Sequence, residues 1–230
     1  MSRVALGAFI VVRPASGANR VDLPLARAEA NGENHRMSVP GRVVILNGAS
    51  SSGKTTLAEH FRDAKASEGE CWLLLGIDDF LIKLPEQWFA YPGYGGPFRD
   101  AGVRYEPYSE GLEPRVGEVG RRLLAAYHEA VAACARVGFN VLVDDVCFDE
   151  HSAAGWQDAL AGLPAAFVAV RCEPDIAEAR EQARGDRLPG LARGLSGLVH
   201  RDLAYDFEVD TSCADIETVT AQLISFIDAT

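Results

Sequence analysis

The stretch that decides the fold reads Val43-Val44-Ile45-Leu46-Asn47-Gly48-Ala49-Ser50-Ser51-Ser52-Gly53-Lys54-Thr55. Its opening run of four apolar residues is typical of a strand buried on both faces. From Gly48 onward it matches the pattern G-x-x-x-x-G-K-[ST] in full, which joins a strand to a helix and cradles phosphate groups. We therefore expect a buried strand, a phosphate-binding loop and a helix that begins near Lys54.

Each residue type in this loop serves that chemistry. Gly48 and Gly53 permit backbone angles that turn amide N–H groups inward, where they and the helix N-terminus hold the phosphates. Lys54 reaches the β- and γ-phosphates of a nucleotide, and the hydroxyl of Thr55 is a ligand for Mg²⁺. A glycine- and serine-rich turn without function would not account for the Lys54-Thr55 pair. The residues that we assign to ATP binding are Gly48, Ala49, Ser50, Ser51, Ser52, Gly53, Lys54, Thr55 and Thr56.

Strands and helices continue to alternate on the C-terminal side of this loop. Apolar runs bounded by turn signals predict four further buried strands, at residues 72–77, 141–143, 167–170 and 207–209. Helical patterns follow Lys54 and cover residues 116–137, 152–160, 176–184 and 215–227. This order predicts an α/β fold in three layers, in which helices flank a five-stranded parallel sheet. The longest helical pattern aligns one apolar stripe: Val119, Leu123, Ala126, Ala130 and Cys134.

Two segments interrupt the alternation. Residues 84–115 are rich in proline, glycine and aromatic residues, and an ordered loop of that length is usually functional. We expect an acceptor-binding loop with these aromatic residues: Trp88, Phe89, Tyr91, Tyr94, Phe98, Tyr105 and Tyr108. Residues 184–205 form the second segment, which we expect to be a helical lid. Its arginines are Arg184, Arg187, Arg193 and Arg201.

Pairs of aspartates end two of the predicted strands. Ligands of open α/β sheets bind outside the carboxyl ends of the strands, so both pairs are expected to face the phosphate loop. Either Asp144 or Asp145 could hold Mg²⁺, directly or through water, and we favour Asp144. We favour Asp78 as the base that accepts a proton from an attacking hydroxyl, and Asp79 as a helix N-cap. A purely structural capping role is the alternative for both pairs.

A run of charged residues precedes the predicted lid: Arg180-Glu181-Gln182-Ala183-Arg184-Gly185-Asp186-Arg187. Arg184 and Arg187 flank a glycine break, so they could fold over the phosphates, stabilise charge on the transferred group and exclude water. The alternative is a solvent-facing helix whose arginines pair with Glu181 and Asp186. That alternative suits Arg180 best.

Composition narrows the remaining possibilities. The chain has 230 residues, of which 48% are hydrophobic and 24% charged, and this excludes a disordered tail, a collagen-like repeat and a coiled coil. A formal net charge of −11 argues against a nucleic-acid-binding protein. The five cysteines are scattered without zinc spacing, and no apolar run is long enough to span a bilayer. We therefore expect a cytoplasmic protein with no membrane partner, and a homo-oligomer stays open.

The first 36 residues differ from the rest of the chain. They hold five arginines and three acidic residues, a net charge of +2, so the remainder carries −13. A charge break just before Met37 marks a boundary. We expect residues 1–40 to be an extension that is disordered or precedes the true start codon, an appended strand being the third interpretation. The domain is then expected to cover residues 41–230.

Five motifs, taken in order, resemble those of the chloramphenicol phosphotransferase family over about residues 42–228. They are the phosphate loop with its leading Leu46-Asn47, Gly76-Ile77-Asp78, Asp144-Asp145-Val146, Arg184-Gly185-Asp186-Arg187 and Tyr205-Asp206-Phe207-Glu208-Val209-Asp210-Thr211. The resemblance implies a small-kinase fold that transfers the γ-phosphoryl group of ATP to the primary hydroxyl of the antibiotic and inactivates it. It also implies that Asp78 is the catalytic base and that Arg184 and Arg187 are lid arginines. Residues 84–115 and 1–36 depart from the family pattern, so the resemblance covers the nucleotide half of the site only.

These observations predict an ATP-dependent O-phosphotransferase that acts on a hydroxyl of a small molecule, with Mg²⁺ as its metal ion. The expected catalytic residues are Lys54, Asp78, Arg184 and Arg187, and the expected metal ligands are Thr55 and Asp144. Two alternatives stay open. The acceptor could be another metabolite, a nucleoside or a sugar nucleotide. The protein could instead be a switch that only hydrolyses its nucleotide, with residues 84–115 as a surface for a partner.

Overall fold

Five parallel strands form the central sheet of the computed structural model, which describes residues 39–185 and 187–230. They are β1 (Val43–Asn47), β2 (Trp72–Gly76), β7 (Asn140–Asp145), β8 (Ala165–Arg171) and β9 (Phe207–Asp210), in the order β2-β7-β1-β8-β9. The predicted five-stranded parallel sheet is confirmed, with the strand before the phosphate loop at its centre. The expected extension over residues 1–40 lies outside the described residues, except for its last two positions.

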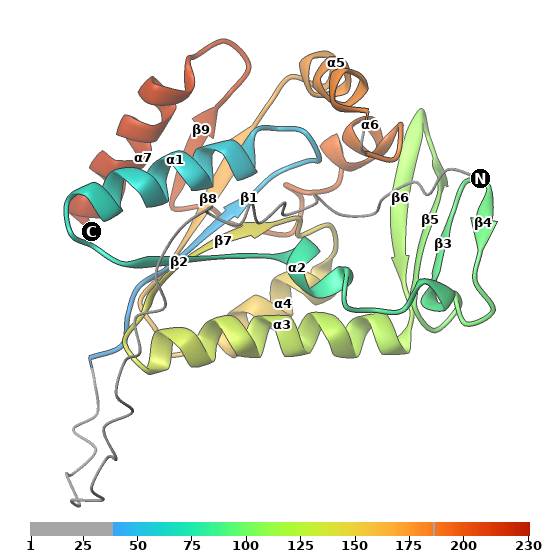
Figure 1. Ribbon diagram of the computed structural model, residues 1–230, viewed down its shortest axis with the longest axis horizontal. Coiled ribbons are helices and arrows are strands. Elements are labelled where there is room, and N and C mark those ends of the chain that lie inside the picture. The colour runs from blue at the N-terminus through green and yellow to red at the C-terminus, as the bar shows by residue number, and fades with distance from the viewer. Residues whose placement is uncertain (1–38, 186) are drawn as a thin grey trace, which may run out of the picture.

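Helices cover both faces of this sheet and give the expected three layers (Figure 1). One face carries α1 (Lys54–Ser67) and α7 (Ile216–Ala229), and the other carries α3 (Glu118–Arg136) and α4 (Glu150–Ala159). Side chains alternate along a strand, so Val43 and Ile45 pack with the second pair of helices. Val44 and Leu46 pack with the first pair. This burial on both sides explains why β1 is an unbroken apolar run.

The longest helix buries a different stripe from the one that its pattern indicated. The buried residues of α3 are Gly120, Leu124, Tyr127, His128, Val131, Ala132 and Ala135. The predicted stripe, from Val119 to Cys134, is half-buried or exposed. Alanines occur on several sides of α3, so the apolar period alone does not choose a face. The large ring of Tyr127 decides it, because it packs against Trp156 of α4 with the ring centroids 5.2 Å apart.

Residues 84–115 are not the loop that we expected. After a short 3-10 helix, η1 (Glu86–Trp88), they form most of a second sheet of four strands with the order β4-β3-β5-β6. These strands are β3 (Phe89–Tyr91), β4 (Tyr94–Gly95), β5 (Val103–Tyr108) and β6 (Gly111–Val116). Figure 1 shows this sheet at one end of the molecule, beyond the short helix α2 (Ile77–Leu81).

Two prolines hid these strands from the sequence analysis, because proline interrupts the pattern that marks a strand. Pro114 is tolerated because β6 is an edge strand. Pro107 lies in β5, where β3 pairs only as far as Arg104, so β6 is the one pairing partner at this level among the described strands.

The arginine-rich segment adjoins the second sheet. It contains the end of α5 (Pro174–Arg184) and the short helix α6 (Leu191–Ser196), which is the helical part of the predicted lid. Figure 1 shows α6 between α5 and β6. The second sheet and the lid therefore lie next to each other, near the carboxyl ends of the central strands.

Candidate active site

The carboxyl ends of three neighbouring strands bring the predicted site residues together. The strand register pairs Asn47 of β1 with Asp145 of β7, and Gly76 of β2 with Asp144. The phosphate loop follows Asn47, and α2 with its two aspartates follows Gly76. All of these groups therefore meet at one edge of the sheet, as the rule for open α/β sheets predicts.

The loop between β1 and α1 has the backbone conformation of a phosphate cradle. Gly53 has a φ of 93° and Ser51 a φ of 59°, both in the left-handed region. The hydroxyl oxygens of Ser51 and Ser52 are buried and have no hydrogen-bond partner among the described residues. Buried polar atoms are normally satisfied, so these two hydroxyls fit a ligand that brings acceptor oxygens. Thr211, which follows β9, steadies the loop by donating its hydroxyl to the Ser52 carbonyl at 2.5 Å.

The Lys54 side chain lies over this loop and is only 5% exposed. Its ammonium donates to the Ala49 carbonyl at 2.8 Å and lies 4.0 Å from a carboxylate oxygen of Asp144. Burial lowers the pKa of Lys54, while the charge of Asp144 opposes the shift. The loop thus holds a localised positive charge beside the cradle of N–H groups.

The aspartates that end β7 have different surroundings. Asp144 accepts a hydrogen bond from the Thr55 hydroxyl at 2.5 Å, so both residues predicted as metal ligands lie together. Asp145 is 1% exposed and accepts from the indole N–H of Trp156 at 2.6 Å. Burial raises the pKa of Asp145 to about 6 and also raises the pKa of Asp144. Only Asp144 of this pair faces the loop.

The two aspartates in the first turn of α2 also have different roles. We expected Asp79 to be the N-cap of this helix, but the N-cap is Gly76; Asp79 lies three residues later, and its carboxylate accepts the backbone N–H of Gly76 at 2.9 Å. Asp78 has a half-exposed side chain and forms an ion pair with Arg187, with 2.9 Å between Nη1 and Oδ2. Of the two, Asp78 is the carboxylate that lines the cavity.

The arginines before the lid fall into two groups. Arg184 and Arg187 line the same cavity as Lys54 and Asp78. Arg180 instead donates to the Thr211 carbonyl at 2.7 Å, so the alternative of a solvent-facing arginine paired with Glu181 is wrong. Glu181 is itself buried.

The cavity has a volume of about 120 Å³. Six of the nine predicted nucleotide-binding residues line it, and Gly48, Ala49 and Ser52 do not. Asp78, Asp144 and the two lid arginines complete its polar side. Apolar residues that the sequence analysis did not assign to the site form the other side: Ile77, Leu81, Pro114, Val146, Phe148, Leu191 and Leu195. They come from separate segments, and only Ile77 and Val146 lie within motifs that the sequence analysis identified.

The aromatic residues of 84–115 line this cavity far less than we expected. Tyr105 of β5 is the one ring of the seven that reaches it. Burial raises the pKa of Tyr105, and the charge of Asp78 adds to the shift. The others serve the second sheet itself: Trp88 packs on Phe98, and Tyr91 stacks on Tyr94, each with ring centroids about 5 Å apart.

Asn47 joins three parts of the site, although the sequence analysis gave it no role. Its buried side-chain amide donates to the Val199 carbonyl at 2.5 Å and to the Tyr205 hydroxyl at 2.7 Å. Its amide oxygen accepts the N–H of Cys147 at 2.8 Å. Asn47 therefore connects the start of the phosphate loop to the segment after β7 and to the residues that follow α6.

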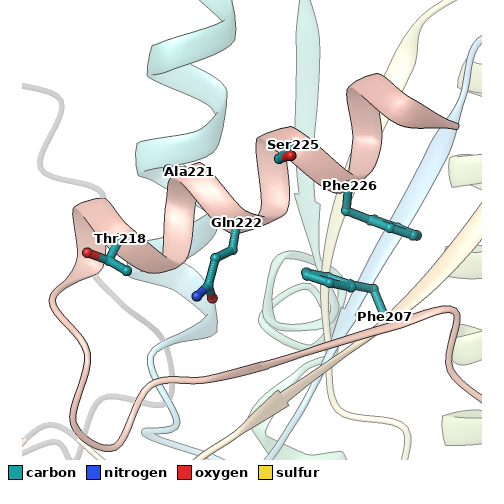
Figure 2. A pocket seen from close by; sticks show the side chains of 6 residues that line it. All are labelled: Phe207, Thr218, Ala221, Gln222, Ser225 and Phe226. Atoms are coloured by element: carbon teal, nitrogen blue, oxygen red, sulfur yellow. The ribbon is translucent and has the colours of Figure 1, made fainter.

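A second hollow lies between β9 and α7, away from these groups (Figure 2). Figure 2 shows Phe207 stacked on Phe226, and the ring centroids are 4.6 Å apart. The remaining lining residues are Thr218, Ala221, Gln222 and Ser225. None of the six carries a charge, so this hollow offers no group for acid–base or phosphate chemistry.

A phosphate loop at the central strand, with a carboxylate at the end of a neighbouring strand and arginines across the cavity, is the equipment of a kinase-type phosphotransferase. Comparison with solved structures supports the fold of that class. The APS kinase CysC of Mycobacterium tuberculosis, solved with AMPPNP and APS, superposes with a TM-score of 0.58 at 17% identity and covers 82% of this chain and 98% of its own. A gluconokinase from Sinorhizobium meliloti gives a TM-score of 0.54 at 16% identity and covers 84% and 94%.

Sequence comparisons identify the family of this chain as well as its fold. The model of the family described as “Chloramphenicol phosphotransferase-like protein” matches residues 41–228. Two Mycobacterium tuberculosis sequences, both named “Putative O-phosphotransferase”, are 35% identical over 193 residues, which are 80% of this chain and 80% of each relative. The chain belongs to the chloramphenicol phosphotransferase-like family, and it is a phosphotransferase that acts on a hydroxyl group. Among the described residues, no helix has both the length and the apolar character needed to cross a bilayer.

Proposed function

We propose that this enzyme transfers the γ-phosphoryl group of ATP to the hydroxyl of a small, uncharged and largely apolar alcohol. One observation carries the proposal: Asp78, Lys54 and the lid arginines share a cavity that apolar side chains also line. A base beside phosphate-binding groups suits phosphoryl transfer, and an apolar wall suits the carbon skeleton of an acceptor.

The residues of the loop fit a nucleoside triphosphate. The unpartnered hydroxyl of Ser51 and the Lys54 ammonium, both of which belong to residues that line the cavity, supply donors for phosphate oxygens. Thr55 and Asp144 supply hard oxygen ligands of the kind that Mg²⁺ prefers. No group of three or more His, Cys, Asp or Glu side chains in the described part of the chain could hold a metal alone. The remaining ligands of a bound Mg²⁺ would be phosphate oxygens and water, and the ion would neutralise phosphate charge.

The chain's own side chains then divide the work of transfer. Asp78 accepts the proton of the acceptor hydroxyl as the hydroxyl oxygen attacks the γ-phosphorus, the bond from that phosphorus to the bridging oxygen breaks, and ADP leaves. Lys54, Arg184 and Arg187 stabilise the charge on the transferred group. Arg187 pairs with Asp78 in this structure, so it lies within reach of the base and of the phosphates that the loop would hold. The apolar wall excludes water, which would otherwise compete as an acceptor.

The wall also restricts the acceptor. Its apolar side chains, such as Leu81, Val146 and Phe148, offer surface to a ring or a hydrocarbon. Chloramphenicol, an uncharged aryl alcohol, is the acceptor to test first, and its phosphorylation would inactivate the antibiotic.

A coupled assay for ADP with mass spectrometry of the products tests the proposal. Wild type is given ATP and Mg²⁺ with chloramphenicol, and then with a panel of uncharged alcohols. We expect one of these alcohols to gain a phosphoryl group, and Asp78→Asn to lower turnover by about 10³-fold with AMPPNP affinity retained. Full activity of Asp78→Asn would exclude this base. ADP formation without any phosphorylated alcohol would favour a switch that only hydrolyses its nucleotide.

A further inference from the structure

A buried carboxylate joins α5, which ends at Arg184, to α6, which follows Arg187. Glu181 of α5 is 3% exposed. Its two oxygens accept the backbone N–H groups of Gly190 at 2.7 Å and Ala192 at 2.8 Å, where α6 begins. Burying a carboxylate is costly unless hydrogen bonds compensate it, and an apolar side chain here would leave two N–H groups without an acceptor. The arrangement therefore depends on a side chain with two acceptor oxygens.

The same glycine is held from its other side by the second sheet. The carbonyl of Gly190 accepts the N–H of Leu112 in β6 at 2.9 Å. Gly190 has a φ of 93°, a conformation that favours glycine. Gly194 lies so close to this strand that a Cβ atom there would come within 2.0 Å of the Leu112 carbonyl oxygen. Both polar groups of the Gly190 backbone are thus bonded, one to α5 and the other to β6.

We propose that Glu181 is a positioning residue for the lid arginines. Arg184 lies three residues after Glu181 in the same helix, and Arg187 lies three residues before Gly190. Leu188, between Arg187 and Gly190, is buried and adds a second anchor. By holding Gly190 against α5, the carboxylate fixes the backbone near Arg187. It thereby places the guanidinium of Arg187 beside Asp78. The role rests on the proposed function, because it presumes that Arg187 meets a nucleotide phosphate.

A double-mutant cycle on nucleotide binding tests this role. The affinity for AMPPNP with Mg²⁺ is measured by calorimetry for wild type, Glu181→Gln, Arg187→Ala and the double variant. Loss of a charge-assisted hydrogen bond weakens an interaction by roughly tenfold or more. We expect each single variant to bind about tenfold more weakly, and the double variant to bind no more weakly than Arg187→Ala alone. Such non-additivity would not follow from a general loss of stability.

Glu178→Gln is the matched control. Glu178 lies one turn earlier in α5 and also links to α6, through Arg193, but its side chain is partly exposed. The variant makes the same change of charge on the same helix, and we expect AMPPNP affinity within about twofold of wild type. If Glu181→Gln does not fold, Gly190→Ala weakens the same junction through its strained φ and takes its place in the cycle.

The outcomes separate the two proposals. If wild type does not bind AMPPNP, the proposed function fails and this role fails with it. If wild type binds and the cycle is additive, or Glu181→Gln binds like wild type, the proposed function survives and the positioning role is overturned.

Discussion

The proposed nucleotide side and the proposed acceptor side of the cavity are built in different ways. The nucleotide side is one continuous strand, loop and helix at the centre of the main sheet, with one carboxylate from the next strand. The acceptor side takes one or two side chains from each of several segments, such as Tyr105 from β5, Leu81 from α2 and Leu191 from α6. Polyphosphate is recognised largely by backbone N–H groups, which a short motif can supply. A particular alcohol is recognised by side chains that only the tertiary fold brings together.

The largest effect is expected on the nucleotide side, from Lys54→Met. This change keeps an apolar chain of similar length and removes the ammonium beside Asp144. We expect phosphoryl transfer to fall by at least about 10³-fold, since a fixed charge facing the transferred group is lost. The coupled assay measures the rate, and circular dichroism confirms the fold. Retention of most of the activity would show that the loop lysine does not serve the reaction.

The stability of the core beneath the phosphate loop is expected to depend on pH because of Asp145. Burial raises the pKa of Asp145 from 3.8 to about 6, so the folded protein keeps a proton that the unfolded chain has already lost. Asp145 therefore stabilises the folded protein fully at pH values below 3.8. This contribution, about 3 kcal/mol, is lost as the pH rises through about 6. Asp145→Asn keeps an acceptor for Trp156 without the charge.

Denaturant unfolding at about pH 4 and about pH 7 measures this difference. The variant is expected to gain about 2 kcal/mol relative to wild type over that interval, because the unfolded chain has already lost part of the Asp145 proton at pH 4. A difference that does not change with pH would mean that folding does not raise the pKa of Asp145.

The acceptor side is expected to respond to Tyr105→Leu. The loss of an aromatic ring from the cavity wall is expected to raise KM for the acceptor by about tenfold and to leave KM for ATP unchanged. Tyr108→Leu is the control, because Tyr108 lies on the same strand but is 39% exposed and does not line the cavity. Equal effects on both substrates would place Tyr105 on the nucleotide side instead.

The smallest effect is expected at the junction of the two sides, from Asp79→Ala. Loss of the hydrogen bond to the Gly76 N–H is expected to lower the free energy of unfolding by about 1 kcal/mol, as for other helix caps. Turnover is expected to change by less than about threefold, in contrast to Asp78→Asn. Thermal unfolding and the coupled assay give the two readouts. A large loss of turnover would transfer the base role to Asp79.

The nucleotide side was predictable from the sequence because its signals are local. The phosphate loop and the five strands follow from residue type and period alone, although β2 and β9, at the edges of the sheet, are only partly buried. The choice between Asp144 and Asp145 follows from strand alternation once the layers are known. Asp145 shares a face with Val143, which packs with α3 and α4, whereas Asp144 shares the face of Leu142 and of α1.

The acceptor side was not predictable in the same way. In the second sheet β3 and β4 are short, and β5 and β6 each contain a proline, so residues 84–115 carried no periodic signal. Aromatic content indicated a cavity lining, but six of the seven rings do not reach the cavity. Composition cannot distinguish a ring that faces a ligand from one that holds a small sheet together. Glu181 was missed for a related reason, because a glutamate in a charged helix is usually solvent-exposed.

The contact between β6 and α6 has a consequence for changing the acceptor by design. Backbone meets backbone there, at Leu112, Gly190 and Gly194, with no side chain between them to absorb a change of shape. A hairpin transplanted from a relative into positions 103–116 would therefore have to bring its own α6 segment. To change the acceptor, the hairpin and the lid segment would have to be exchanged together.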